Sequence, residues 1–298
     1  MENCVAGFDV LAKIKEGSLG TIWCVAGPGG SLLAVKQLSA EKGADPAQRK
    51  RFRKEFDLQK GLDHKSILRV FDFVEKPPQD AFTMEYFESE GLKTALYCLP
   101  DRVNHREFKI LRQIADALSH VHEKGVVHKD LKPENVLIDA GGTIRLIDFS
   151  LAQARWDRWL QFGKRMEGTP MYMAPEQARG GRCDARTDAY AFGLIMYELL
   201  GKRMPFSERN PEAFLRAHQT QPPPPLTELV PGLAPDLNQM VLGLLDKDPG
   251  KRPVMKDVVV ALTRWEVADP AMRRKQVRMF DAPRSLPDPF NDSRHAKS

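Results

Sequence analysis

The chain has 298 residues, of which 42% are hydrophobic and 29% are charged. These proportions are typical of a soluble globular protein, and the length allows about two domains or one large unit of two lobes. The net charge of +5 is modest, and it favours anionic ligands without indicating a nucleic-acid-binding protein.

The sequence shows no pattern typical of a membrane span, a signal peptide, a zinc site or a disulfide framework. No apolar run approaches the roughly 20 residues that a membrane-spanning helix needs, and the N-terminus lacks the basic and apolar blocks of a signal peptide. The cysteines lie far apart without metal-binding spacing, which argues against a zinc site or a disulfide framework. They are Cys4, Cys24, Cys98 and Cys183. We therefore expect a cytoplasmic protein with no membrane span.

The first predicted elements are strands. Residues 8–25 alternate polar and apolar positions around a G-x-x-G run at 17–20, which predicts two strands joined by a flexible turn. Glycine there lets backbone N–H groups approach phosphate oxygens, although such a run alone is most often an ordinary hairpin turn. Residues 32–38 predict a third strand, whose Lys36, taken alone, would extend to solvent.

Residues 48–62 have helical periodicity, with Phe52 and Phe56 on one side. The basic run at 49–54 interleaves with these phenylalanines, so we interpret it as a solvated helix face rather than a nucleic-acid patch. Residues 67–74 and 81–86 then predict two more strands. Together these elements predict an antiparallel N-terminal sheet with one helix.

From Gly91 onward the pattern is helical. An apolar stripe predicts a buried helix over residues 107–124, which Gly125 ends. His120 and His122 fall in its last turn, where histidine favours the helix dipole. We expect neither histidine to bind a ligand.

The stretch 128–150 is predicted to form a β-hairpin with polar groups at both of its mouths. Its apolar runs, 136–138 and 144–147, are separated by Gly141 and Gly142, which favour a turn.

This hairpin would bring Asp130, Asn135 and Asp148 together at one edge. Two carboxylates and an amide suit Mg²⁺, which prefers oxygen ligands and shares them with substrate phosphates. Lys132 would then face the transferred phosphoryl charge. The stretch therefore predicts phosphate chemistry.

Two motifs in this stretch resemble those of the protein kinases. The run HKDLKPEN at 128–135 is similar to the catalytic-loop pattern H-R-D-x-K-x-x-N, and DFS at 148–150 is similar to D-F-G. Residues 34–36 also match the strand pattern A-x-K. The run GTPMYMAPE at 168–176 resembles the substrate-docking loop and A-P-E motif, with a wording especially like that of bacterial serine/threonine kinases.

The resemblance implies an α+β, bilobal protein-kinase-like fold over residues 8–265. Its parts would be a small antiparallel β-sheet lobe with one helix (8–84), a hinge (85–90) and a larger, mainly helical lobe (91–265). The tail at 266–298 is basic, contains several prolines and has little periodicity, so we expect it to be disordered.

The resemblance also assigns roles to individual residues. It makes Asp130 and Lys132 catalytic, with Asp130 accepting the proton of the substrate hydroxyl. It makes Asn135 and Asp148 ligands of Mg²⁺, with Mn²⁺ as an alternative cation. The residues expected around ATP are Ile14, Lys15, Glu16, Gly17, Ser18, Leu19, Gly20, Thr21, Ile22, Ala34, Lys36, Glu55, Met84, Glu85, Phe87 and Leu137.

Within this set, the strand lysine would contact the α- and β-phosphates and pair with Glu55 of the helix. Glu41 is a weaker candidate for that pairing because it precedes the helix. Met84 would lie behind the adenine, although taken alone it is simply a core residue. The backbone of Glu85 and Phe87 would hydrogen-bond the adenine edge.

The activation segment implied by the resemblance runs from 148 to 176. Residues 151–168 contain no Ser, Thr or Tyr but include Trp156, Trp159 and Phe162. A phosphate switch therefore has little to act on there, and the aromatic side chains would order the loop by packing or form a docking surface.

Two further residues are expected to support this machinery. Asp188 would brace the backbone of the catalytic loop. Arg252 would pair with Glu176 in a buried ion pair whose loss destabilises the fold.

Residues 15–22 resemble the glycine-rich loop of the protein kinases, G-x-G-x-x-G-x-V. Three positions depart from the family patterns: Lys15 replaces the first glycine of that loop, Ser150 replaces the glycine of D-F-G, and Lys129 replaces the arginine of H-R-D. The first two stiffen loops, and the third removes a bidentate anchor for a loop phosphate. All directly required polar groups are nevertheless present, so we expect an active enzyme that phosphorylates Ser and Thr of proteins, including itself. The alternative is a pseudokinase that acts as a nucleotide-binding scaffold. A small-molecule phosphotransferase would lack the docking run at 168–176.

Overall fold

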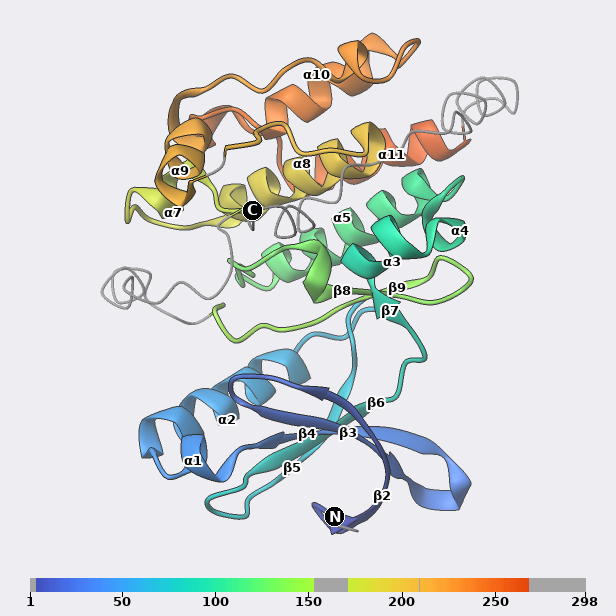
Figure 1. The fold of residues 1–298 in the computed structure, drawn as a ribbon, viewed down its shortest axis with the longest axis vertical. Helices are drawn as coiled ribbons and strands as arrows, with labels where there is room; N and C mark the ends of the chain where they lie inside the picture. The colour runs from blue at the N-terminus through green and yellow to red at the C-terminus, as the bar shows by residue number, and fades with distance from the viewer. Residues whose placement is uncertain (1–3, 153–170, 209, 268–298) are drawn as a thin grey trace, which may run out of the picture.

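Figure 1 shows a computed structural model of the chain, in which residues 4–152, 171–208 and 210–267 are described. A sheet-rich N-terminal lobe lies below a larger helical lobe, and the chain passes between them after β6. This is the bilobal α+β arrangement that the sequence predicted.

The N-terminal lobe is built on one antiparallel sheet with the strand order β1-β2-β3-β4-β6-β5. The strands are β1 Cys4–Val5, β2 Phe8–Glu16, β3 Gly20–Ala26, β4 Leu32–Leu38, β5 Val70–Val74 and β6 Ala81–Glu85. Strand β4 has the predicted bounds, and β1 was not predicted. Strand β5 begins at Val70 rather than at 67 because Ile67 forms a parallel bridge with Leu146 of the other lobe.

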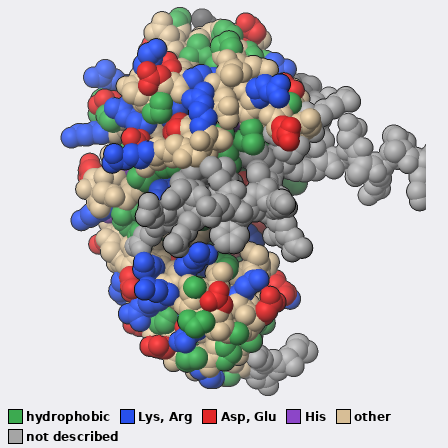
Figure 2. Space-filling model, turned by 90° about the vertical axis from the view of Figure 1, so that its left-hand side faces the viewer, with side chains coloured by type: hydrophobic (Ala, Val, Ile, Leu, Met, Phe, Trp, Pro, Cys, Tyr) green, Lys and Arg blue, Asp and Glu red, His purple; other side chains and the backbone are tan. Residues whose placement is uncertain are grey.

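Helix α2, Pro46–Lys60, packs its aromatic side against this sheet. Phe52 and Phe56 are buried and contact Phe73 and Phe82, with ring centroids 5.0–6.0 Å apart. The basic run at 49–54 faces outward, as predicted for an amphipathic helix. On the face shown in Figure 2, Lys and Arg side chains lie beside Asp and Glu side chains in both lobes.

The prediction of a single helix in this lobe needs one correction, because a short helix, α1 (Ala40–Gly43), precedes α2. Ser39 caps it by accepting from the Lys42 N–H. Gly43 allows the close approach of the hairpin that joins β5 to β6, since a Cβ there would lie 1.5 Å from the Pro78 carbonyl oxygen.

The second lobe contains a small sheet, ordered β7-β8-β9, and a bundle of helices. The strands are β7 Glu90–Gly91, β8 Val136–Ile138 and β9 Ile144–Leu146. The helices are α3 Leu92–Cys98, α4 Pro100–Val103, α5 Glu107–Glu123, α7 Pro175–Ala178, α8 Ala185–Gly201, α9 Pro211–Thr220, α10 Pro235–Leu244 and α11 Met255–Val267. Three short 3₁₀ turns also lie in the described part of this lobe, η2 Pro133–Asn135, η3 Leu226–Glu228 and η4 Pro249–Lys251, whereas η1, Pro28–Gly30, joins β3 to β4 in the N-terminal lobe.

Helix α8 forms the centre of this lobe, and every residue from Thr187 to Gly201 is buried. Gly193 lets α10 approach closely, because a Cβ there would lie 2.8 Å from the Cβ of Leu244. Helix α5 follows the predicted apolar stripe and ends at Glu123, just before Gly125, which adopts a φ of +70°.

The last described element, α11, extends through Val267, and Glu266 forms an ion pair with Arg112 of α5. The helix therefore reaches past the expected end of the lobe at 265. The remainder of the predicted tail, 268–298, lies outside the described residues. Among the helices that are described, none combines the length and apolar character needed to cross a membrane.

Candidate active site

The catalytic-loop backbone is held by Asp188, at the start of α8. Its carboxylate accepts from the His128 N–H and the Lys129 N–H, both at 2.8 Å, and contacts His122 Nε2 at 2.8 Å. Burial alone would raise the pKa of Asp188, but the hydrogen bonds from His122 and the backbone outweigh it and lower the pKa. An ionised carboxylate thus fixes the loop, including Lys129, which has a φ of +66°.

Asp130, Lys132 and Asn135 lie together on this loop. The Lys132 ammonium donates to Asp130 Oδ2 at 2.8 Å, and the Asn135 amide nitrogen donates to the Asp130 carbonyl at 2.8 Å and to its Oδ2 at 3.1 Å. Burial would lower the pKa of Lys132, but the Asp130 carboxylate beside it raises that pKa, so the lysine is charged. Asp130 and Asn135, two of the three side chains predicted to converge here, are thus in direct contact.

Asp148 lies two residues after the end of β9 and is placed by its neighbours. The Ile147 N–H donates to the Asn135 carbonyl at 3.0 Å, which joins the ends of the hairpin. Phe149 is buried against the ring of His128, 4.8 Å away. Burial raises the pKa of Asp148, but the positive charge of Lys36 and a hydrogen bond from Ser150 outweigh it, so the pKa is lowered.

The donor set at this edge fits a hard divalent cation. Asp148 supplies an ionised carboxylate, and Asn135 uses its amide nitrogen within the chain, which leaves the amide oxygen as a ligand. Within the described ranges no group of three His, Cys, Asp or Glu residues could hold a metal alone. Such a site needs phosphate and water oxygens to complete its coordination, as Mg²⁺ sites typically do.

Lys36 on β4, which is half-buried, and Glu55 on α2, which is buried, form an ion pair with Nζ and Oε1 2.5 Å apart. Burial would lower the pKa of Lys36, and the charges of Glu55 and Asp148 together raise it, so the lysine is a cation. The glutamate side chain is only 4% exposed. The competing candidate, Glu41, lies on α1, is exposed and contacts Lys42 instead.

The loop between β2 and β3 turns through Ser18 and Leu19. Gly17 and Gly20 close it with reciprocal backbone hydrogen bonds of 2.9 and 3.3 Å. Gly20 has a structural role that the sequence did not predict, because a Cβ there would lie 1.9 Å from the Gln37 carbonyl oxygen on β4. Lys15 pairs with Ile22 in the β2–β3 ladder, just after a register shift between Lys13 and Lys15, so β2 continues through this departure from glycine.

Most of the apolar residues expected around ATP belong to one cluster beneath the sheet. Ala34 and Met84 are paired across β4 and β6 and are buried there. Leu19, Ile22, Phe87 and Leu137 pack against the same cluster. Ile14 differs, because 48% of its surface is exposed. Two polar residues of the expected set, Glu16 and Thr21, face each other across the β2–β3 ladder.

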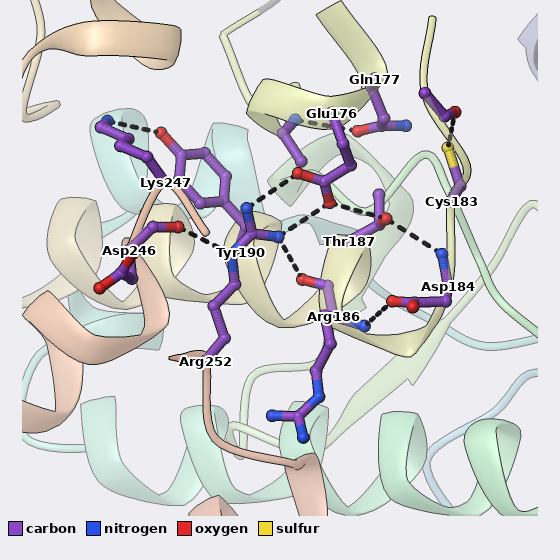
Figure 3. A network of polar contacts seen from close by, with 12 residues as sticks. Glu176, Gln177, Cys183, Asp184, Arg186, Thr187, Tyr190, Asp246, Lys247 and Arg252 are labelled. Carbon is purple, nitrogen blue, oxygen red and sulfur yellow. Dashed lines mark hydrogen bonds and ion pairs between the residues drawn. The ribbon is translucent and has the colours of Figure 1, made fainter. Parts of the chain in front are cut away.

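The A-P-E motif is anchored by the predicted pair of Glu176 and Arg252, drawn in Figure 3. The two side chains meet through parallel hydrogen bonds of 2.8 Å, and Thr187 donates to the same carboxylate at 2.9 Å. The arginine also donates to the backbone carbonyls of Arg186 and Asp246 at 2.7 and 2.8 Å. Each of the three nitrogens of this guanidinium thus donates at least one hydrogen bond inside the lobe.

The sequence did not reveal a second anchor of the docking run. Tyr172 and Tyr97 both donate to the Glu198 carboxylate, which is fully buried, and Lys93 pairs with it at 2.7 Å. These residues belong to segments distant in the sequence, and no motif marks them. The predicted loop residues Trp156, Trp159, Phe162 and Thr169 lie outside the described residues.

Comparison with known proteins agrees with this arrangement. The family model described as protein kinase domain matches residues 8–261. The chain is 35% identical over 256 residues to serine/threonine-protein kinase Pkn2 of Myxococcus xanthus, covering 83% of this chain and 31% of that protein. It is 33% identical over 226 residues to PknB of Mycobacterium tuberculosis, covering 74% of this chain and 36% of that protein.

The crystal structure of the Mycobacterium tuberculosis PknI kinase domain matches with a TM-score of 0.67 at 27% identity, covering 89% of this chain and 98% of that one. The chain therefore belongs to the protein kinase family, close to its bacterial serine/threonine members. It spans about a third of the length of the curated relatives named above.

Proposed function

We propose that this chain is an ATP-dependent serine/threonine protein kinase that transfers the γ-phosphoryl group of ATP to Ser and Thr hydroxyls of proteins, its own included. The observation that carries the proposal is the ion pair of Lys36 and Glu55, with Asp148 close enough to raise the pKa of the same lysine. A lysine held as a cation between these two carboxylates suits a ligand that carries phosphate charge together with a divalent cation.

The chain's own groups divide the work of phosphoryl transfer. Asp130 accepts the proton of the attacking hydroxyl, while Lys132, held 2.8 Å from it, offsets the charge that develops on the phosphoryl group. Lys36 holds the α- and β-phosphates. Asn135 and Asp148 would bind Mg²⁺, or Mn²⁺ in its place, and the bound cation supplies neutralisation of phosphate charge.

The nucleotide would lie between the loop at 17–20 and the hinge. The apolar cluster that contains Ala34, Met84 and Leu137 would contact the adenine. Backbone groups of Glu85 and Phe87 would hydrogen-bond its edge. We propose residues 8–265 as the kinase domain, with partners limited to ATP and protein substrates, and we place the protein in the cytoplasm.

The pseudokinase alternative rests on the three departures from the family patterns. It is less well supported, because Lys15 still pairs with Ile22 in the β2–β3 ladder and Lys129 still contacts the following segment, donating to the Ala152 carbonyl at 3.0 Å. The charged groups that phosphoryl transfer requires are also held by neighbouring groups: Lys36 by Glu55, Asp130 by Lys132, and Asp148 by the Ser150 N–H.

Radiolabelled ATP with Mg²⁺ tests the proposal, with the native chain compared to Asp130→Asn and a general protein substrate present. We expect phosphate on Ser and Thr in the native reaction and at least about 100-fold less with the variant. Incorporation that survives the substitution unchanged, or none in either reaction, would overturn the proposal.

A further inference from the structure

The hinge is connected to the helical lobe by a contact that the kinase motifs do not include. Arg145 on β9 reaches Glu85 at the end of β6, with Nε 3.0 Å and Nη2 2.9 Å from the carboxylate Oε1. The guanidinium carbon also lies 4.6 Å from the centroid of the Phe87 ring. The two side chains of the ion pair are only 19% and 23% exposed, so this contact is more than a surface pair.

The carboxylate of Glu85 has a second role in the sheet. In a regular antiparallel ladder, two hydrogen-bonded residues exchange both of their backbone bonds. Here the Glu85 N–H donates to the Arg69 carbonyl at 2.9 Å, but the returning Arg69 N–H donates to Glu85 Oε2 at 3.3 Å. The Glu85 carboxylate, rather than the Glu85 backbone carbonyl, thus accepts from the Arg69 N–H. The backbone carbonyl of Glu85 is therefore left for another donor.

Arg145 is presented from a rigid position. Strand β9 pairs with β8 on one side, and on the other Leu146 exchanges backbone hydrogen bonds of 2.8 and 3.1 Å with Ser66 and Leu68. Arg145 lies directly opposite Leu137 in the ladder, so both side chains project from the same face of the hairpin. Leu137 is one of the residues proposed to contact adenine.

From this geometry we propose that Arg145 is a positioning residue of the adenine site. It holds the Glu85 carboxylate against Arg69, and thereby keeps the Glu85 carbonyl directed to the nucleotide base. This inference rests on the proposed function, because it concerns how that site selects its nucleotide.

The selection follows from hydrogen-bond polarity. Adenine offers a donor, its exocyclic amine, and beside it the N1 acceptor, whereas guanine offers an acceptor followed by a donor. The Phe87 carbonyl already accepts from the Ser89 hydroxyl at 2.8 Å, so the Glu85 carbonyl and the Phe87 N–H form the pattern that matches adenine. A hinge fixed in this register rejects guanine, since buried polar groups would be left unpaired.

Without Arg145, the Glu85 carboxylate can leave Arg69, whose N–H then donates to the Glu85 carbonyl as in a regular ladder. The hinge would lose its acceptor for the adenine amine. Affinity for ATP should fall, while affinity for GTP, which cannot use that acceptor, should change little.

Isothermal titration calorimetry of the whole chain with Mg-ATP and with Mg-GTP tests the inference. We expect Arg145→Ala and Glu85→Ala each to weaken ATP binding about 10-fold and GTP binding less than about 3-fold. The double variant should be no weaker than either single one, because both changes release the same carbonyl. Arg145→Lys, which keeps the charge but loses the bidentate geometry, should restore part of the affinity.

Arg53→Ala is a matched control, because Arg53 also pairs with a carboxylate, Asp57 at 2.9 Å, and stacks 4.7 Å from an aromatic ring, Phe73. It should leave both affinities unchanged. If Arg145→Ala weakens ATP and GTP binding equally, or if the losses of ATP affinity add in the double variant, the positioning role of Arg145 is overturned. The proposed function would be unaffected by that result. A native chain that binds neither nucleotide would overturn the proposed function as well.

Discussion

Glu176 and Arg252 are 76 positions apart in the sequence and meet through two hydrogen bonds of 2.8 Å in the interior of the helical lobe. The arginine side chain is fully buried, and its face lies 4.8 Å from the centroid of the Tyr190 ring. The pair ties the end of the docking run to the turn that precedes α11, so it supports the site without touching substrate.

Replacing Arg252 should destabilise the protein strongly. Arg252→Met leaves the Glu176 carboxylate buried without its main partner, which costs about 3–5 kcal/mol. Urea unfolding followed by circular dichroism measures the change. Arg53→Met removes an exposed pair and should cost no more than about 1 kcal/mol. Equal losses for the two variants would contradict the importance of the buried pair.

Glu55→Gln should reduce phosphoryl transfer while the fold persists. The ammonium of Lys36 would lose the carboxylate that fixes it 2.5 Å away, and a displaced catalytic group costs about 100-fold in rate. Steady-state kinetics with a peptide substrate gives the value. Glu41→Gln serves as the control, since Glu41 is exposed on α1. A Glu55 variant with native kcat/KM would refute the assignment.

Tyr172→Phe should weaken the docking of protein substrates specifically. Tyr172 connects the docking run to the buried Glu198, and a hydrogen bond to a charged acceptor corresponds to about 10-fold in affinity or more. We expect KM for the peptide to rise by about this factor and KM for ATP to stay constant. Tyr97→Phe removes a donor to the same carboxylate from α3 instead. If the two variants raise the peptide KM equally, the docking run is not the element affected.

His218 should make stability depend on pH. It is fully buried beside Tyr190, and burial together with the positive charge of Lys247 lowers its pKa from 6.5 to about 3. A lowered pKa means that the unfolded chain binds the proton more readily. The stabilising contribution of neutral His218 to the free energy of unfolding is therefore complete above pH 6.5. It is lost as the pH falls from 6.5 toward about 3.

The free energy of unfolding, measured across this pH range for the native chain and for His218→Gln, tests the assignment. The variant should show a shallower fall toward acid. His105→Asn is the control, because His105 is exposed, and its curve should run parallel to the native one. A native slope in the His218 variant would show that other groups cause the acid sensitivity.

The sequence was informative where chemistry requires a motif or where periodicity is strong. The ends of β4, the position of α5, and the pairings of Lys36 with Glu55 and of Arg252 with Glu176 all followed from local patterns or family motifs. The segment around 67 was less predictable, because an apolar run does not reveal which strand it will join. Its pairing with β9 became visible only in three dimensions.

Contacts between side chains without a motif were not predictable at all. Arg145 lies between two buried residues of a short strand, Ile144 and Leu146, and resembles any solvated arginine in sequence. Lys93 and Glu198 lie 105 positions apart, and only the packing of α3 against α8 shows that they pair. The identity of a long-range partner depends on the geometry of the fold, which residue type and spacing do not encode locally.

The position of Asp188 also affects how the protein loses activity on heating. One carboxylate in the buried helix α8 accepts from the N–H groups of His128 and Lys129, the two residues that precede Asp130, the proposed catalytic base. The position of the proposed catalytic base therefore depends on the packing of the interior of the helical lobe. Thermal inactivation should coincide with unfolding of the helical lobe, and the first local unfolding of α8 should already abolish phosphoryl transfer.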